Sequence, residues 1–456
     1  MGFAMPQVRF SLAVAALRKS FAAETTSRRE FVTGILLCIG LALLPFGDIQ
    51  PLRAVGGGYL ASPAGLLIAA AWVIWGPKPR RSLFGFLGAL VAVSCLLSAS
   101  LLLDSGQTYF LDEIPAVKDI KMAIDLATEV AVFYAGFELS KRFPTSFSIG
   151  FSIALSLSVV MAVVTLMGWK VFDEGNFFHS WVNVQGRVRA AQGEASYFAA
   201  SLILICGALA LLARTSRVRI IMLALAVVTP AVLTASRGAF VGLAVALMVF
   251  AVIWMTRRFV RPNWLIFWAA LLATGTAVMA FLLPAVTASQ LWRSVGLADT
   301  QYTSDATRAA WAFAVLLAVI ASPIGLGLAS SVIQSQNFLI QAQVFLSGAF
   351  SEKQWAEVDN LIRTGSDLQL APKSLVTVFT LILGVLGFAA IVLVYTRIYL
   401  AQEILVTSSV DSNLLKIFAL WVMVFAAVSY GSITSWDLVL VLGILSSKPR
   451  ATQCVS

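Results

Sequence analysis

Residues 374–396 read SLVTVFTLILGVLGFAAIVLVYT, and no charged side chain interrupts this stretch. A helix rises about 1.5 Å per residue, so a run of this length crosses a hydrocarbon layer of about 30 Å. Lipid offers the backbone no hydrogen-bond partners, so a spanning segment of this composition should be a helix. Similar runs recur along the chain, and together they predict an all-α polytopic membrane protein.

The composition of the whole chain favours the same fold class. Its 456 residues are 59% hydrophobic and only 12% charged, about half the charged share of a soluble domain. A soluble core cannot bury so much apolar surface, which excludes an ordinary cytosolic enzyme. The four cysteines and the single histidine lack metal-ligand spacing, so we expect neither a metal site nor a cofactor.

Twelve apolar runs are expected to be transmembrane helices, and the last of them is the shortest. They cover residues 31–47, 59–75, 83–103, 121–139, 146–168, 194–213, 217–234, 238–256, 263–283, 374–396, 414–430 and 434–446. Residues 1–30 precede them as an inner interfacial segment rather than a signal peptide, because basic pairs at 18–19 and 28–29 lead directly into the first run.

Positive charges set the expected orientation. With the N-terminus inside, the inner segments carry 20 of the 32 Lys and Arg residues, the bias typical of cytoplasmic loops. Both termini, including the tail 447–456, are therefore expected in the cytoplasm. The net charge of +10 is then a topology signal, and nucleic acid is not expected as a partner.

The expected domain organisation places spans one to nine in 31–283 and spans ten to twelve in 374–446. Residues 284–373 form a large outer loop between them, and loops of this length are usually functional. Within this loop, residues 306–322 are apolar but end at Pro323. We expect a helix there that lies on the outer surface or packs into the mouth of the bundle.

Polar residues at the outer ends of the expected helices are the candidate site. The basic ones are Arg187, Arg189, Arg237, Arg308 and Lys373, with Ser374 beside them, and the carboxylates are Glu194 and Asp305. Arginine presents a planar fork of donors that suits phosphate, and helix N-termini add partial positive charge. The pattern predicts a diphosphate site, although a single arginine at a helix end is more often a snorkelling anchor or a cap.

Two carboxylates lie inside an expected span. Asp125 and Glu129 are four residues apart, on one face of the helix expected at 121–139. Carboxylates within a membrane are costly and usually have partners. We prefer structural pairing for them, while neutralising the outer arginines, relaying protons and lining a wet cavity stay open.

Four stretches, taken in their order and spacing, carry a family resemblance. They read RVRAAQGEASYFAASL (187–202), TASRGAFVGLAVAL (234–247), SDATRAAWAFAVLLAVIASPIGLGL (304–328) and PKSLVTVFTLILGVLGF (372–388). The set resembles the O-antigen polymerase and O-antigen ligase superfamily of bacterial envelope enzymes. The family's Glu-Pro-Ser is Glu194-Ala195-Ser196 here, and the His-Asn typical of ligases is Lys373-Ser374, which favours a polymerase.

The resemblance implies a GT-C-like, metal-independent glycosyltransferase of the bacterial inner membrane, with its active site facing the periplasm. It would join undecaprenyl-diphosphate-linked oligosaccharides, as donor and acceptor, into O-antigen or exopolysaccharide. The implied catalytic residues are Arg237, Arg308, Glu194 and Asp305, and the implied substrate-binding residues are Arg187, Arg189, Ser236, Tyr197, Lys373 and Ser374.

Membrane lipid and a chain-length regulator protein are the further partners that the resemblance implies. Two alternatives stay open. One is an O-antigen ligase that transfers glycan to lipid A-core. The other is a polytopic transporter or flippase, although the outer position of the long loop and the lack of repeated halves argue against a major-facilitator chain.

Overall fold

The computed structural model describes residues 27–47, 49, 52, 62–76, 92–100, 114–167, 195–213, 215–234, 242–251, 303–364, 374–403, 410–428 and 435–447. These residues are nearly all helical and include no strand, so the described chain is all-α, as the apolar runs predict. Two of its helices are long and apolar enough to cross a membrane, Pro144–Leu166 and Leu375–Ala401. Each expected run holds described helix except 263–283, which lies outside the described residues.

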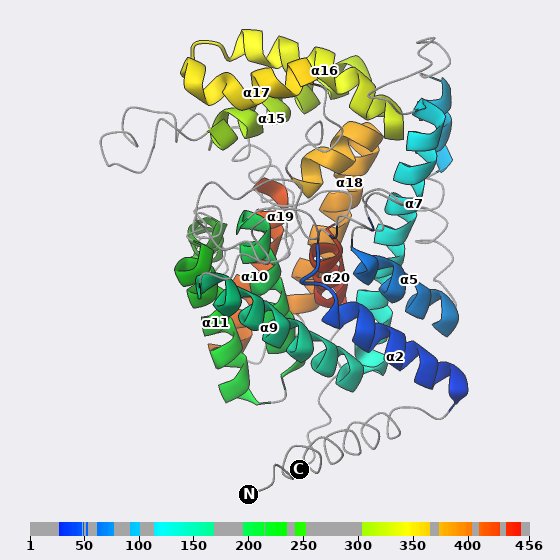
Figure 1. Cartoon of the computed structure of the whole chain (residues 1–456), viewed down its shortest axis with the longest axis vertical. Helices are drawn as coiled ribbons and strands as arrows, with labels where there is room; N and C mark the ends of the chain where they lie inside the picture. The colour runs from blue at the N-terminus through cyan, green and yellow to red at the C-terminus, as the bar shows by residue number, and fades with distance from the viewer. Residues whose placement is uncertain are drawn as a thin grey trace, which may run out of the picture.

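Most of the helices pack into one bundle (Figure 1). Its members are α2 (Arg28–Ala42), α5 (Pro63–Trp75), α7 (Pro115–Tyr134), η1 (Ala135–Leu139), α8 (Ser140–Arg142), α9 (Pro144–Leu166), α10 (Ala195–Leu212), α11 (Ser216–Thr234), α18 (Leu375–Glu403), α19 (Val410–Val428) and α20 (Trp436–Ser446). Helix α10 packs against α11, and α2 packs against both α5 and α9. Their apolar side chains form one continuous core.

Helix α20 occupies the centre of this bundle. Every one of its 11 residues is buried, against α7, η1, α18, α10 and α19. Eleven residues rise about 16 Å, roughly half of a hydrocarbon layer. The last expected run is therefore a short helix wholly enclosed by protein, and the close contact of Gly136 with the Leu440 carbonyl shows how tightly it is held.

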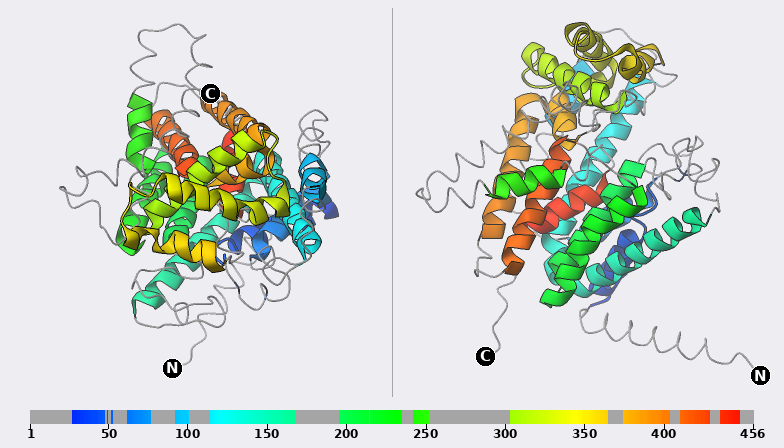
Figure 2. Two further views of the ribbon diagram at one scale, coloured as in Figure 1. Left: turned by 90° about the horizontal axis from the view of Figure 1, so that it is seen from above. Right: turned by 90° about the vertical axis from the view of Figure 1, so that its left-hand side faces the viewer.

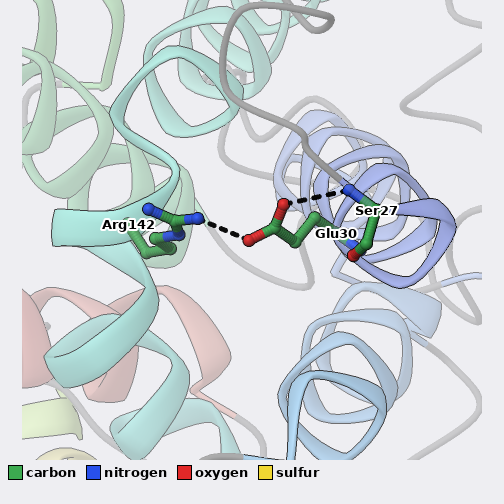
Figure 3. Close-up of polar contacts among 3 residues, drawn as sticks. All are labelled: Ser27, Glu30 and Arg142. Atoms are coloured by element: carbon green, nitrogen blue, oxygen red, sulfur yellow. Dashed lines mark hydrogen bonds and ion pairs between the residues drawn. The ribbon is translucent and has the colours of Figure 1, made fainter.

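Charged side chains tie several helices together at one end of the bundle, which we call the basic end. Glu30 completes a capping box with Ser27 at the start of α2 and also accepts a hydrogen bond from Arg142 of α8 (Figure 3). Arg29 donates to the Ile74 carbonyl at the end of α5. Arg397 of α18 lies over the ring of Phe137.

Three helices form a separate layer at the opposite end, which we call the cap (Figures 1 and 2). They are α15 (Thr303–Ala321), α16 (Leu328–Phe345) and α17 (Glu352–Thr364). Helix α15 lies where a helix was expected at 306–322. It packs against α16, α17 and α18 and buries Trp311. Helices α16 and α17 were not expected, because they fall outside any long apolar run.

Candidate functional site

The cap joins the bundle at a break in α18. Gly384 adopts φ +60° and ψ −139°, so the helix stops there and restarts on the next residue. The turn between α15 and α16, residues 322–327, packs against this break. Gly325 in the turn also has a positive φ, +97°, a conformation that favours glycine. A Cβ on Gly384 would lie 2.1 Å from the Pro323 carbonyl oxygen, so only a glycine fits there.

Backbone hydrogen bonds close this joint. Leu326 and Gly327 donate their N–H groups to the carbonyls of Leu381 and Ile382, over 3.0 and 2.9 Å. In return, the N–H of Val385 donates to the carbonyl of Pro323 over 2.9 Å. A helix break exposes backbone groups that a membrane cannot satisfy, so such breaks occur where protein supplies the partners. The turn 322–327 is that partner for α18.

A second attachment holds the start of α16. Asp119 of α7 accepts a hydrogen bond from the Ala329 N–H over 3.0 Å, and Ser98 accepts one from the Ser330 N–H over 3.2 Å. The first N–H groups of a helix have no partner within the helix, so these two side chains cap α16 from other segments. Neither Asp119 nor Ser98 was expected at a functional position, because no local sequence pattern marks a side chain that caps a distant helix.

Arg308 is the one candidate arginine whose side chain the structure describes. It lies on α15, one turn after the helix begins, between the fully buried residues Thr307 and Ala310, and is itself half-buried. A half-buried guanidinium beside the cap core suits a binding role, because arginine keeps its charge when it is partly removed from water. Asp305 lies in the first turn of the same helix.

The two remaining described candidates have structural positions. Ser374 is buried and is the N-cap of α18: its Oγ accepts a hydrogen bond from the Thr377 N–H over 3.3 Å. Tyr197 of α10 is partly buried and packs against the bundle core. These contacts explain why a serine and a tyrosine occur there without a substrate. The candidates outside the described side chains are Arg187, Arg189, Glu194, Ser236, Arg237, Asp305 and Lys373.

Asp125 and Glu129 are buried on α7, between the cap and the bundle. Their exposed fractions are 8% and 1%, and Met122 and Leu126 beside them belong to the cap core. Within the described part of the chain, both oxygens of Glu129 and one of Asp125 lack a hydrogen-bond partner. The positive charge of Lys118 partly compensates the negative charge of Asp125. The two carboxylates, Asp125 and Glu129, repel each other. Structural pairing was preferred for these carboxylates, and no donor among the residues that the structure describes reaches Glu129.

Comparison of the chain with family models, with curated proteins and with solved structures gives no match.

Proposed function

We propose that this chain is a polymerase that joins undecaprenyl-diphosphate-linked oligosaccharide units into O-antigen or exopolysaccharide. The observation that carries the proposal is the joint between the turn 322–327 and the break at Gly384. These two segments belong to two of the stretches that resemble the polymerase and ligase superfamily, 304–328 and 372–388. Their direct contact supports treating the separate stretches as parts of one functional unit.

The two ends of α15 differ in character, and this difference favours a lipid-linked anionic substrate. Arg308 lies near the start of the helix, and the side chains toward its end, Leu316 and Ile320, are apolar and exposed. Twelve residues separate Arg308 from Ile320, which is about 18 Å along a helix. A lipid diphosphate has the same division, with a charged head group and a hydrocarbon tail.

In the proposed reaction, an acceptor hydroxyl attacks the anomeric carbon of the donor sugar. The new glycosidic C–O bond forms as the bond between this carbon and the diphosphate oxygen breaks, and undecaprenyl diphosphate leaves. Arg308 and Arg237 would stabilise the negative charge that develops on the diphosphate, a contribution of about 2–4 kcal/mol per preorganised donor. Glu194 or Asp305 would accept the hydroxyl proton or orient the acceptor, while Arg187, Arg189 and Lys373 would hold the second lipid-linked glycan.

The proposal places the chain in the bacterial inner membrane with about twelve spans and with the cap facing the periplasm. Described basic residues at the end away from the cap, including Arg29, Arg142, Arg217 and Arg397, support a cytoplasmic basic end. Donor and acceptor glycans would then meet on the periplasmic side, beside α15 and the outer end of α18.

Arg308 variants test the proposal in a strain whose own copy is deleted. Arg308→Ala should leave single exported repeats instead of long polymer, and Arg308→Lys should restore it only in part, because lysine keeps the charge and lacks the planar fork. Arg363→Ala is the matched control, since Arg363 is exposed on α17 of the same cap. Wild-type polymer in the Arg308→Ala strain, at normal protein level, would overturn the assignment.

A transporter or flippase is the second candidate, and two observations favour it. Discontinuous helices such as α18 and unpaired carboxylates such as Glu129 are both found in transporters. The glycan profile of the deletion strain separates the candidates. Loss of a flippase strands repeats on the cytoplasmic side, whereas loss of a polymerase leaves single repeats that have crossed the membrane.

A further inference from the structure

The last turn of α15 and the turn that follows it carry large apolar side chains that are exposed. Ile320 and Ile324 are 69% and 55% exposed, and Pro323 between them is exposed as well. No charged residue occurs anywhere between Arg308 and Glu352. We call residues 320–327 the cap tip. An exposed apolar patch of this kind usually marks contact with another molecule or with a membrane.

The exposed side chains of the cap tip continue onto α18. The backbone of Val385 is hydrogen-bonded to Pro323, and both Val385 and Leu386 are exposed. The tip therefore shares one apolar surface with α18, the most apolar of the described long helices. A surface that is continuous with a membrane-spanning helix has the same surroundings as that helix.

The position of the joint along α18 gives the depth of the tip. Gly384 lies nine residues after Leu375, which is about 14 Å along the helix. The apolar run 374–396 begins at the same end, and its middle falls at Val385. If this run fills a hydrocarbon layer of about 30 Å, a segment bonded at Gly384 is well inside that layer.

Most backbone N–H groups of the turn 322–327 have a hydrogen-bond partner within the protein, which lipid surroundings require. Ser322 donates its N–H to the Ala318 carbonyl and its Oγ to the Gly325 carbonyl over 2.6 Å, and Gly325 donates its N–H back to Ser322. Leu326 and Gly327 donate their N–H groups to backbone carbonyls of α18. Non-helical backbone is tolerated at membrane depth only with such partners.

The other side of the cap has the opposite character. Helix α17 carries Glu352, Lys353, Glu357, Asp359 and Arg363, and its apolar side chains Trp355 and Val358 are buried toward the rest of the cap. A charged outer helix and an uncharged exposed tip are the two faces of an element that is partly immersed in a bilayer.

We propose that the cap tip is a re-entrant segment that contacts the hydrocarbon chains of the bilayer. The cap is then anchored in the membrane at Ile320 and Ile324 and projects α17 into water. This inference concerns lipid contact alone, so it stands or falls independently of the proposed polymerase activity.

Site-directed spin labelling of the full-length chain tests the inference. Cys38, Cys95, Cys206 and Cys454 are first replaced, and single cysteines are then introduced by Ile324→Cys and Ile320→Cys, both at exposed positions. The labelled protein is reconstituted into vesicles of phosphatidylethanolamine and phosphatidylglycerol. Leu393→Cys, 59% exposed on α18, is the lipid-facing control, and Ala356→Cys, exposed on α17, is the water-facing control.

The readout is the accessibility of each label to molecular oxygen, which partitions into lipid, relative to a water-soluble nickel chelate. At positions 320 and 324 this ratio should match position 393 and exceed position 356 several-fold. A ratio at 320 and 324 equal to that at 356 would overturn the proposal. If the cysteine-free chain does not fold, a photoreactive amino acid at position 324 of the native chain decides, because it should crosslink to phospholipid, and its failure to do so counts against the inference.

Discussion

The two ends of the bundle are held together in different ways. At the basic end, side chains connect neighbouring helices, as Arg142 does with Glu30. At the cap joint, backbone hydrogen bonds between the turn 322–327 and α18 provide the connection. Between the two ends, the carboxylate of Glu129 has no hydrogen-bond partner among the residues described. A side-chain contact can be removed by one substitution that leaves the backbone in place, whereas the backbone joint depends on glycines that no other residue can replace. A buried carboxylate without a partner is expected to lower stability.

The largest expected effect comes from Gly384→Ala at the cap joint. The new Cβ would lie 2.1 Å from the Pro323 oxygen and 2.4 Å from the Gly325 nitrogen, at a residue with φ +60°. We expect a loss of more than about 4 kcal/mol in the free energy of unfolding, measured by thermal unfolding in detergent. Gly348→Ala, also in the cap but with nothing within 4 Å of the added Cβ, should change it by less than about 0.5 kcal/mol. Equal stability of both variants would show that the joint does not hold the cap.

Arg142→Ala should have the next largest effect, at the basic end. It leaves the buried carboxylate of Glu30 without its guanidinium, and losing a hydrogen bond to a charged group costs about 2 kcal/mol. Arg217→Ala removes an exposed arginine from α11 and should leave the same unfolding measurement unchanged. If the two variants unfold alike, the basic end is held by apolar packing alone.

Ser374→Ala removes the N-cap of α18 above the joint and should cost about 1 kcal/mol. Ser374→Thr keeps the hydroxyl and should retain most of the stability. The glycan profile of the same strains shows whether Ser374 serves as a helix cap or binds substrate. Normal polymer from a destabilised Ser374→Ala protein would assign it to capping, and loss of polymer at unchanged stability would assign it to substrate binding.

Glu129→Gln is the one substitution of this series that should not lower stability, with an outcome between no change and a gain of about 1 kcal/mol, because it replaces a buried carboxyl group that has no partner among the described residues. Glu30→Gln weakens a pairing instead and should lower stability in the same assay. A large loss for Glu129→Gln would mean that the carboxylate has a partner in the folded protein, and the contrast between the two glutamates would disappear.

The length of the apolar runs predicted most of the described helices well. It failed for helices that are buried by other parts of the protein. Helix α9 covers 144–166 where 146–168 was expected, since both length and composition are local properties. Helix α16 was missed because serine and glutamine interrupt its apolar residues, and its burial comes from packing against the other helices of the cap and α7. Helix α20 was expected as a span, yet its short length suits a helix enclosed by neighbours.

The residues of the candidate site also divide into those that the sequence identified and those that only the structure identified. Charge and position drew attention to Arg308, and the structure describes it as half-buried on the cap helix α15. Ser374 was chosen because it stands beside Lys373 at the start of an expected span, but its hydroxyl caps a helix, a role decided by the exact first residue of α18. Asp119 was not chosen, because its partner is an N–H group more than 200 residues away in the chain.

The sequence by itself determined that this chain is helical and rich in membrane-length apolar runs, because hydrophobicity and helix rise are properties of single segments. It also marked Gly325 and Gly384 as members of two separate motifs. Only the tertiary structure decided that these glycines meet, that the turn 322–327 packs against the break in α18, and that Glu129 has no partner among the described residues. Those outcomes depend on which distant segments pack together, and no local pattern encodes that choice.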